Sequence, residues 1–523
     1  MNRQLVKTKR GDDDDDDGSA IAIDRLSQLP QPILHNILSL LPQGDAVRTC
    51  LLSKSWRYLW HGRLNVEFRD DDYRFDRIKE FWSFVDKTLQ RYLDLNLSLK
   101  KFQVDIYHQE FDSVLLQKWI PVLIMNMGVR SFSLSFHESG ILFPLPLVVF
   151  QSESLVELHL QQCDLNKLNS TVNVMLNNLR TLRLHSVYIK DEIFDKIISG
   201  CPLIESLDMS WCNILKSMKL RKHFNIKKFR FMAPNEIIVE IENPQTLGSV
   251  HIQKCRDWFF RHRNTHSPHL KSLNLHSVQL PETFDNFSSL FPCLNELILD
   301  NCDGLKEFRL ISSSIKRLTI KMDHINPGKG INAFIDTPNI RYFEYSGHGF
   351  LPSIKFTSTS NEWKSQISLC YKLELSDNDA TSWFLKLNKL LKALNQSHIT
   401  LSLVPDEYKK LHINDSYGGF DKPVAVEHLK LRECYSSYFD PAILDCFFRI
   451  FRPCYIQMDS GLARCNLAEY ISKLIPDETG CYFWLQDLEE ISTEVGNMEA
   501  NEWKEQQKIR FRLTWKEELS KFT

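Results

Sequence analysis

The stretch LVELHLQQC, Leu155–Cys163, carries the pattern that decides the fold. Leucine stands at its first, fourth and sixth positions, polar residues alternate with the last two leucines, and cysteine ends the stretch. Such alternation is typical of a short strand with one buried face. The stretch therefore predicts a strand that buries its leucines on one side and presents polar side chains on the other.

The same pattern returns along the chain, with Ile, Val, Phe, Met or Tyr in place of some leucines. Between Leu155 and Ile340 the first positions lie 21 to 25 residues apart, which is the period of leucine-rich repeats. One unit cannot bury its own apolar face, so the units stack into a solenoid of the α/β class. Its parallel sheet lies on the concave face and its helices and loops lie on the convex face. Clear copies begin at Leu155, Leu179, Ile204, Leu247, Leu270, Leu294, Ile315 and Ile340, and weaker copies begin at Leu99, Val129, Ile226 and Val426.

The cysteines support this periodicity independently. Of the 13 cysteines, Cys163, Cys212, Cys255, Cys302 and Cys434 share one phase, eight residues after the first position of a repeat. Repeats of this class place Asn or Cys there, inside the turn that follows the strand. We therefore interpret these five as structural thiols and expect no metal and no cofactor. With no secretory leader in the N-terminal residues, they indicate a reducing compartment, the nucleus or the cytoplasm.

A second informative stretch precedes the repeats. Residues 24–60 read DRLSQLPQPILHNILSLLPQGDAVRTCLLSKSWRYLW and predict three short helices. The first carries a wide apolar stripe from Ile33 to Leu41, Asp45 can cap the second, and the third carries Trp56 and Trp60. So small a cluster has a very small core. Part of its apolar surface is therefore expected to face a partner or the next domain.

This stretch resembles an F-box of the kind common in plant proteins. The resemblance rests on Leu29-Pro30, an Ile-Leu helix ending at Pro42, an Asp-led helix, and Ser53-x-x-Trp56. It implies docking to a Skp-type adaptor and, through it, to the cullin and RING subunits of a ubiquitin ligase. An ordinary helical cap on the repeats is the alternative. The resemblance implies these adaptor-binding residues: Leu29, Pro30, Ile33, Leu34, Ile37, Leu38, Leu41, Pro42, Val47, Leu51, Leu52 and Trp56.

The C-terminal part also resembles plant proteins that combine an F-box with such repeats, in particular their FBD-like endings. Pro441–Ile456 is similar to their helix-then-strand segment, and Cys481–Glu494 is similar to their final segment. Both imply a cap that covers the last repeat.

The predicted organisation follows from these stretches. Asp12–Asp17 form an acidic run, and Phe81, Trp82, Phe84, Val85 and Leu89 form one apolar helix face. We expect the repeat array to be interrupted in its second half. The predicted units are a disordered acidic tail (1–23), the F-box (24–62), a helical connector (63–95), the repeats (96–350), their irregular continuation (351–435) and a C-terminal cap region (436–523).

The polar positions of the repeat strands are the predicted binding face for a target protein of unknown identity. Basic and acidic residues are mixed there, whereas nucleic-acid binding needs one sign to dominate, so no nucleic acid is expected. Apolar runs are too short for a membrane span, and no catalytic motif is present, so neither a membrane protein nor an enzyme is predicted. The candidate target-binding residues are Arg183, His185, Lys228, Arg230, Arg317 and Lys321.

The resemblance and the repeats together predict the substrate-recognition subunit of a Skp–cullin–F-box ligase. Two alternatives stay open. The chain could be a scaffold that binds the adaptor without delivering targets for degradation, or a receptor of the same architecture gated by a small molecule.

Overall fold

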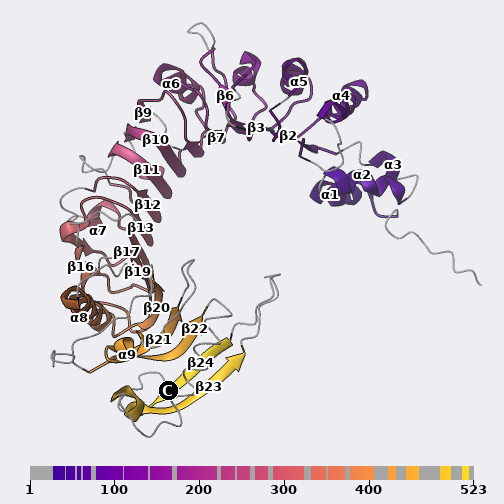
Figure 1. Cartoon of the computed structure of the whole chain (residues 1–523). Coiled ribbons are helices and arrows are strands. Elements are labelled where there is room, and N and C mark those ends of the chain that lie inside the picture. The colour runs from indigo at the N-terminus through magenta and orange to yellow at the C-terminus, as the bar shows by residue number, and fades with distance from the viewer. Residues whose placement is uncertain are drawn as a thin grey trace, which may run out of the picture.

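The protein forms a long arc in the computed structural model (Figure 1). A cluster of short helices lies at the N-terminal end of the arc, strands line its inner side, and most helices lie on its outer side. The structure describes residues 28–41, 43–52, 56–59, 63–71, 78–109, 111–138, 140, 142–167, 173–220, 225–241, 244–258, 266–280, 287–322, 331–348, 351–371, 377–405, 422–431, 443–458, 483–495 and 509–516.

Within these residues, one 19-stranded sheet runs along the arc. Successive repeats contribute neighbouring strands that pair in parallel, from the N-terminal end to β22. The strands are β1 (Asn65–Arg69), β2 (Lys101–Ile106), β3 (Ser131–Phe136), β5 (Glu157–Gln161), β7 (Thr181–His185), β8 (Ser206–Ser210), β10 (Lys228–Ile241), β11 (Ser249–Trp258), β12 (Ser272–His276), β13 (Glu296–Asp300), β15 (Arg317–Met322), β17 (Tyr342–His348), β19 (Lys364–Tyr371), β20 (His398–Pro405), β21 (Val424–Leu431) and β22 (Phe451–Met458), and β9 (Ser217–Leu220) pairs with the end of β10.

The fourth position of the repeat forms a continuous apolar row on the buried face of the sheet, in the core of the solenoid. Leu158 pairs with Leu182, which pairs with Leu207, and the row continues through Phe229 to Val250. Each of these side chains is at most 2% exposed. Because strand side chains alternate, the polar residues between them face the opposite side, as the sequence pattern predicts. The large, mostly parallel sheet and the repeats are thus confirmed.

Several repeats in the middle of the array have a left-handed residue other than glycine just after their paired core strand residues. Six non-glycine residues at the same repeat position have φ between 50° and 59°: Gln162, Ser186, Trp211, Lys254, Ser277 and Asn301. This left-handed turn directs the side chain of the next residue into the core on the buried side of the sheet. In two repeats the thiol there bonds back to the preceding repeat, with Cys212 Sγ 3.6 Å from Leu184 O and Cys302 Sγ 3.2 Å from Leu275 O.

The buried cysteines match the predicted structural role. Cys163, Cys212, Cys255 and Cys302 are free and buried, whereas Cys434 lies outside the described residues. Burial raises the pKa of Cys212, Cys255 and Cys302 to about 12, so their thiols are protonated at neutral pH.

Thiol labelling checks this arrangement. Because the thiolate is the reactive form, iodoacetamide should modify the exposed Cys293 at least about tenfold faster than Cys212 or Cys302 in the native chain. Mass spectrometry of timed samples measures the rates, and a urea-unfolded sample is the control in which the difference should vanish. Equal native rates would contradict the buried position of the turn cysteines.

The return segments of the repeats carry helices and a small second sheet. Figure 1 shows the helices on the outer side of the main sheet. They are α4 (Ile78–Asp94), α5 (Ser113–Met125), α6 (Asp191–Ser199), α7 (Phe287–Leu290), α8 (Asp377–Ala393) and α9 (Ile443–Phe448), with single turns η3 (Leu147–Gln151), η4 (Pro244–Thr246) and η5 (Leu305–Glu307). The small sheet is β14 (Phe308–Ile311), β16 (Asn332–Asp336) and β18 (Ser353–Phe356), and β4 (Phe143–Pro144) pairs with β6 (Cys163–Asp164).

Gly200 ends α6 where two return segments touch. A Cβ atom at Gly200 would lie 2.5 Å from Val174 Cγ1 and 2.6 Å from the Val174 carbonyl oxygen. The carbonyl belongs to the backbone and cannot rotate away. A side chain at this position therefore forces the two repeats apart.

We expect Gly200→Ala to lower the free energy of unfolding by roughly 1–3 kcal/mol, because overpacking strains the neighbouring backbone. Gly248→Ala is the matched control, since its Cβ would meet only Lys227 O at 3.4 Å. Urea unfolding followed by far-UV circular dichroism compares the two variants. Equal stability of the two variants would show that the backbone around Gly200 and Val174 accommodates the extra methyl group without cost.

Two segments differ from the sequence expectation. Residues 63–95 contain a strand as well as the helix: β1 pairs with β2 in register from Asn65–Lys101 to Arg69–Asp105. This segment is the first strand–helix unit of the array rather than a helical connector. The predicted apolar face of its helix is buried at Phe81, Trp82, Val85 and Leu89 and half-buried at Phe84.

Residues 351–435 also depart from expectation, because the main sheet is not interrupted there. Strand β17 pairs with β19, β19 with β20, and β20 with β21, all in parallel. The intervening α8 has 17 residues, more than α5, α6 or α7, and it obscures the repeat period. Ile399, Leu401 and Leu403, which the sequence shows as a loose copy, are all 0% exposed.

The C-terminal end of the sheet changes direction. After η6 (Phe483–Asp487), β23 (Leu488–Val495) pairs antiparallel with β24 (Ile509–Trp515), and β24 pairs antiparallel with β22. Arg452 on β22 is 6% exposed, and its Nη2 lies 2.9 Å from Asp487 Oδ2. The two segments that carry the C-terminal resemblance are thus joined directly by an ion pair.

The N-terminal helices have a core of their own. They are α1 (Gln31–Leu40), α2 (Gln43–Arg48), η1 (Thr49–Leu51) and α3 (Trp56–Leu59). Their buried apolar side chains form a cluster separate from the core of the repeats. Arg63 joins the two parts, because its Nη2 donates to Leu41 O at 2.7 Å and its carbonyl accepts from Tyr92 Oη at 2.8 Å.

Candidate adaptor and target surfaces

Helix α1 carries two adjacent apolar stripes with different environments. Leu34 and Leu38 are at most 3% exposed and pack with Trp56 and Leu59 in the core of the cluster. Ile33 and Leu40, seven residues apart and therefore on one side of the helix, are 45% and 85% exposed. The helix thus fills its own core and still presents apolar side chains to solvent.

More apolar surface follows at the end of η1. Leu51 is 85% exposed and Leu52 is 61% exposed. Four large exposed apolar side chains on so small a unit are consistent with an interaction surface, because contiguous exposed apolar patches mark such surfaces. We call Ile33, Leu40, Leu51 and Leu52 the outer apolar set.

The structure separates the predicted adaptor-binding residues into three groups. Leu34, Leu38 and Trp56 lie in the core, so their direct contact with an adaptor is not supported; they hold the helices together instead. Leu29, Ile37 and Leu41 are half-buried, whereas Pro30, Ile33, Leu51 and Leu52 are exposed. Pro42 lies outside the described residues, as does the side chain of Val47. Sequence reasoning left Leu40 out of the adaptor-binding set, although its place on the Ile33 stripe was visible from the helical period.

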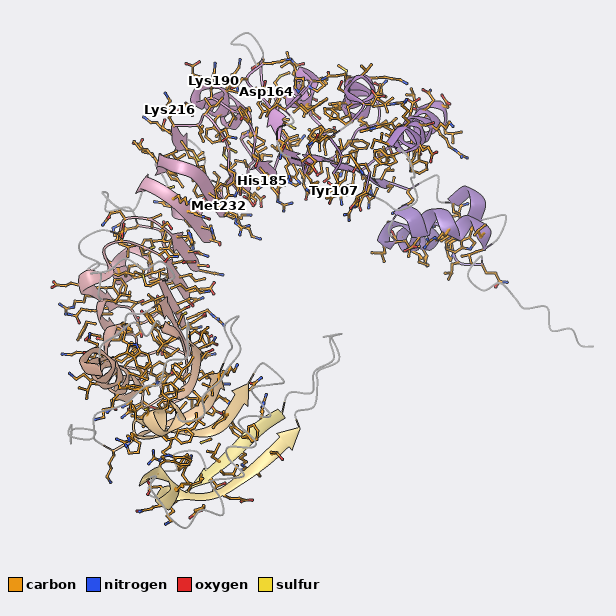
Figure 2. The ribbon with its side chains drawn as sticks, viewed as in Figure 1. Tyr107, Asp164, His185, Lys190, Lys216 and Met232 are labelled. Atoms are coloured by element: carbon orange, nitrogen blue, oxygen red, sulfur yellow. The ribbon has the colours of Figure 1, made fainter. Side chains whose placement is uncertain are left out.

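The inner face of the arc carries the polar repeat positions. Figure 2 shows His185 and Met232 on this inner side, whereas Asp164, Lys190 and Lys216 lie on the outer side. The register of the sheet decides which polar residues become neighbours, although they are more than 20 residues apart in sequence.

Five central strands place a symmetric series of charged and titratable side chains in one row. His159 on β5 pairs with Arg183 on β7, which pairs with Asp208 on β8. Asp208 also pairs with Arg230 on β10, which pairs with His251 on β11. We call these five residues the central row. All five stand at the same outward position of the repeat in the sequence, and the register of the sheet pairs them as a His–Arg–Asp–Arg–His row.

The electrostatics of the central row are dominated by its arginines. Arg230 is 53% exposed and its Nη1 lies 3.9 Å from Asp208 Oδ2, a loose ion pair. Within the described part of the chain, Arg183 has no ion-pair partner. Burial, with Arg183 nearby, lowers the pKa of His159 from its ordinary value, and burial with Arg230 nearby does the same for His251. The histidines are therefore neutral at pH 7, and His251 Nε2 is buried with no hydrogen-bond partner among the described residues.

The other predicted target-binding residues have different surroundings. Lys228, two residues before Arg230, is exposed and without an ion pair in the described structure, and His185 is half-buried with a pKa lowered by burial. Arg317, by contrast, lies 3.7 Å from Glu296 and stacks 4.4 Å above the Tyr342 ring. Lys321 lies 3.8 Å from Glu344. Arg317 is thus held between a carboxylate and an aromatic ring, and Lys321 faces a carboxylate, whereas Arg183 and Lys228 have no ion-pair partner among the described residues.

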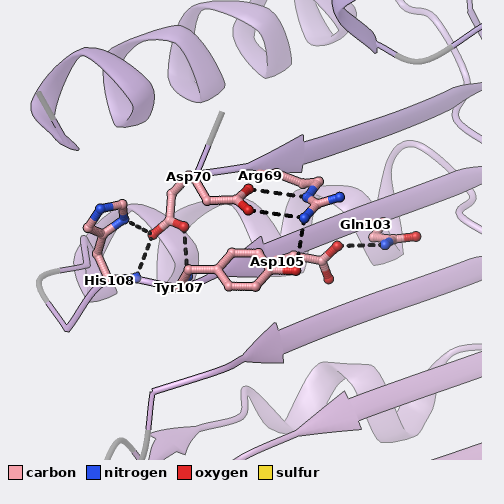
Figure 3. A network of polar contacts seen from close by, with 7 residues as sticks. Arg69, Asp70, Gln103, Asp105, Tyr107 and His108 are labelled. Atoms are coloured by element: carbon pink, nitrogen blue, oxygen red, sulfur yellow. Dashed lines mark hydrogen bonds and ion pairs between the residues drawn. The ribbon is translucent and has the colours of Figure 1, made fainter. Parts of the chain in front are cut away.

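The rim beside the N-terminal helices is a closed polar network (Figure 3). The buried carboxylate of Asp70 accepts the backbone N–H groups of Tyr107, at 2.7 Å, and His108, at 3.1 Å. Arg69 pairs with Asp71 at 3.0 Å and donates to Tyr107 Oη at 3.1 Å, and the Tyr107 ring stacks on His137 at 4.1 Å. These bonds hold β1 and the end of β2 together. The polar groups that form them bond to one another.

A cleft of about 740 Å³ lies between α4 and α5 and is lined by Trp82, Asp86, Asp112 and neighbours. Among the residues that the structure describes, no group of three His, Cys, Asp or Glu side chains is placed to hold a metal ion. No described helix is both long and apolar enough to cross a bilayer.

Comparisons with known proteins agree with both parts of the architecture. Residues 26–66 match the sequence model of the F-box domain, and residues 116–245 match that of the repeats of "FBD-associated F-box protein At5g56370". Neither model describes a catalytic domain.

Relatives from Arabidopsis thaliana are similar over longer stretches. F-box/LRR-repeat protein At3g59200 is 33% identical over 245 residues, covering 42% of this chain and 46% of that protein. Putative F-box protein At1g49610 is 30% identical over 297 residues, covering 57% of this chain and 67% of that protein. F-box/FBD/LRR-repeat protein At5g22660 is 34% identical over 186 residues, covering 35% of this chain and 39% of that protein.

The match thus spans about half the length of these relatives or less, except for At1g49610, where it spans 67%. The N-terminal helices with their outer apolar set and the parallel sheet of stacked repeats agree with this likeness. The chain belongs to the F-box/leucine-rich-repeat protein family of plants.

Proposed function

We propose that the chain is the substrate-recognition subunit of a Skp–cullin–F-box ubiquitin ligase. Its F-box docks a Skp-type adaptor, and its repeats bind the target protein. The protein performs no chemistry itself, and it supplies proximity between the target lysine and the ubiquitin carried by other subunits.

One observation carries the docking half of the proposal. The helical cluster has a filled core of five apolar residues, and yet Leu40 and Leu51 are each 85% exposed. Covering two leucines is worth about 1.5–3 kcal/mol each. A partner that buries them gains stability without rearranging the cluster, which supports a preformed docking face.

The repeats support the recognition half. The inner face is polar and concave, and its side chains project from paired strands whose backbone positions are fixed by the sheet. Rigid display of varied side chains is how solenoids achieve selective protein binding. Arg183 and Lys228 are exposed there without a described ion-pair partner, which supports a role in target contact.

The proposal extends to the organisation of the chain. Residues 24–62 act as the F-box, and Arg63 connects it to the first repeat. The antiparallel pair β23–β24 covers the last parallel strand and acts as the C-terminal cap, which supports the assignment of residues 436–523 to a cap region. The buried free thiols accord with a place in the nucleus or cytoplasm.

Co-purification and target turnover test the proposal together. The tagged full chain should co-purify with a Skp-type adaptor and cullin, and loss of the protein should stabilise at least one bound protein. Adaptor binding without cullin, or bound proteins whose lifetimes do not change, would favour the scaffold alternative. A small molecule that raises the thermal midpoint of the full chain would favour the gated receptor.

A further inference from the structure

The central row has a feature that neither the sequence period nor the family describes. Its two arginines, Arg183 and Arg230, lie on strands separated by one strand, with Asp208 between them. Neighbouring strands are about 4.8 Å apart, so the two guanidinium groups start from backbone positions about 10 Å apart.

That separation matches the geometry of an extended peptide. An extended chain in the polyproline II conformation advances about 3.1 Å per residue and completes a turn every three residues, so side chains i and i+3 lie on the same side about 9 Å apart. A peptide that runs along the arc, across the strands, therefore presents residues i and i+3 to Arg183 and Arg230.

We propose that Arg183 and Arg230 form a two-point clamp for an extended acidic segment of the target, with anionic side chains at positions i and i+3. This inference rests on the proposed function, because it names the class of target segment that the repeats bind. Guanidinium groups bind both carboxylates and phosphates in bidentate geometry, so Asp, Glu or phosphorylated side chains supply the required chemistry.

The charges around the clamp favour an anionic occupant. Lys228 lies on the same strand and face as Arg230, so this part of the face carries the three cations Arg183, Lys228 and Arg230 beside the carboxylate of Asp208. Asp208 is 28% exposed, accepts a hydrogen bond from Ser210 Oγ at 3.2 Å, and pairs only loosely with Arg230. It keeps the two arginines apart without neutralising them both.

The ends of the row limit the length of the occupant. At one end, His159 Nδ1 forms a hydrogen bond with Ser133 Oγ at 3.2 Å. At the other end, His251 Nε2 has no hydrogen-bond partner among the described residues. Beyond His251 carboxylates join the face, since Asp300 lies 3.0 Å from His276 and Glu296 lies 3.7 Å from Arg317. A short acidic peptide segment fits this limited positive patch, whereas a nucleic-acid strand requires a longer track of one sign.

A peptide array with the full-length chain tests the clamp. The probes are twelve-residue Gly/Ser peptides that carry two glutamates, two phosphoserines or two glutamines, with separations from two to six residues. We expect the strongest binding at a separation of three, about tenfold or more above the glutamine peptides. Binding of the phosphoserine series alone would identify a phosphorylated segment, and binding of both series an acidic one.

Three variants make the test specific. Arg183→Gln with Arg230→Gln should lose binding by about tenfold or more, because both charge-assisted contacts disappear. Arg317→Gln is the matched control, since Arg317 lies on the same face and is 51% exposed against 53% for Arg230. Asp208→Asn should strengthen binding severalfold, because it removes the competing carboxylate. A purely structural role for the row predicts no such gain.

Several outcomes would overturn the clamp: no binding of any anionic peptide, no dependence on separation, or equal loss in the Arg317→Gln control. Tighter binding of a single-stranded oligouridylate, lost in the double arginine variant, would replace the peptide with a nucleic acid. Adaptor co-precipitation of the same samples separates the two proposals. A chain that binds adaptor but ignores every anionic peptide refutes the clamp and leaves the ligase function intact.

Discussion

A chain carrying Ile33→Asp and Leu40→Lys is expected to bind the Skp-type adaptor at least about 100-fold more weakly than the unmodified chain. Both residues lie on the exposed side of α1, and burying two large apolar side chains is worth about 3–6 kcal/mol. A factor of 100 corresponds to about 2.8 kcal/mol, which leaves margin for partial burial at the interface. Isothermal titration with purified adaptor measures the change.

The two substitutions are chosen so that the helix itself survives. Aspartate in the first turn and lysine in the last turn both match the helix dipole, and Leu34 and Leu38 remain in the core. Leu95→Asp is the matched control, because Leu95 is an exposed leucine, 54% accessible, at the end of α4 in the first repeat. Unchanged affinity in the double variant, with unchanged helicity, would remove this side of α1 from the docking surface.

The Trp515→Ala substitution should disrupt the packing of the last strands at the C-terminal end of the solenoid. Trp515 is 5% exposed, its Nε1 donates to Pro453 O at 2.8 Å, and the Arg452 guanidinium lies 4.9 Å from its ring. Removing a buried tryptophan side chain costs about 3–5 kcal/mol. The loss releases β24 from β22 and exposes an edge strand that can pair with other chains.

Hydrogen exchange locates this effect. Amides of β22 and β24 should exchange at least about 100-fold faster in Trp515→Ala, whereas amides of β5 and β7 should be unchanged, because coupling in a solenoid is between nearest neighbours. Light scattering should show concentration-dependent aggregation. Lys516→Ala, an exposed neighbour, is the control. Protection that falls uniformly along the array would contradict a local cap.

Helix α1 shows which features of the proposed docking face helical periodicity can predict and which it cannot. The stripe from Ile33 to Leu41 predicts an apolar helix, and the period alone separates it into two faces. The period does not decide which face of the helix is buried, because that depends on where Trp56 and Leu59 pack against the helix. Leu34, Leu38 and Trp56 therefore proved to be core residues, and Leu40 proved to be exposed.

In the second half of the array, the sequence period predicted less regularity than the structure has. The sequence predicts an interruption after residue 350, because the long α8 hides the repeat spacing, yet β19, β20 and β21 continue the sheet. Pairing requires only that the strands reach the edge of the growing sheet. The length of the return segment has little effect, since loop closure costs only a small additional free energy as a loop lengthens.

The sequence by itself determined the repeat, the phase of its buried leucines and cysteines, and the presence of an N-terminal helical unit, because these depend on local periods of two and of 3.6 residues. The sequence places His159, Arg183, Asp208, Arg230 and His251 at one repeat position, and only the tertiary structure decided that their strands pair in direct register. Their neighbourhood depends on the register between strands, and register is set by how the apolar rows of successive repeats stack. No single stretch of sequence contains that information.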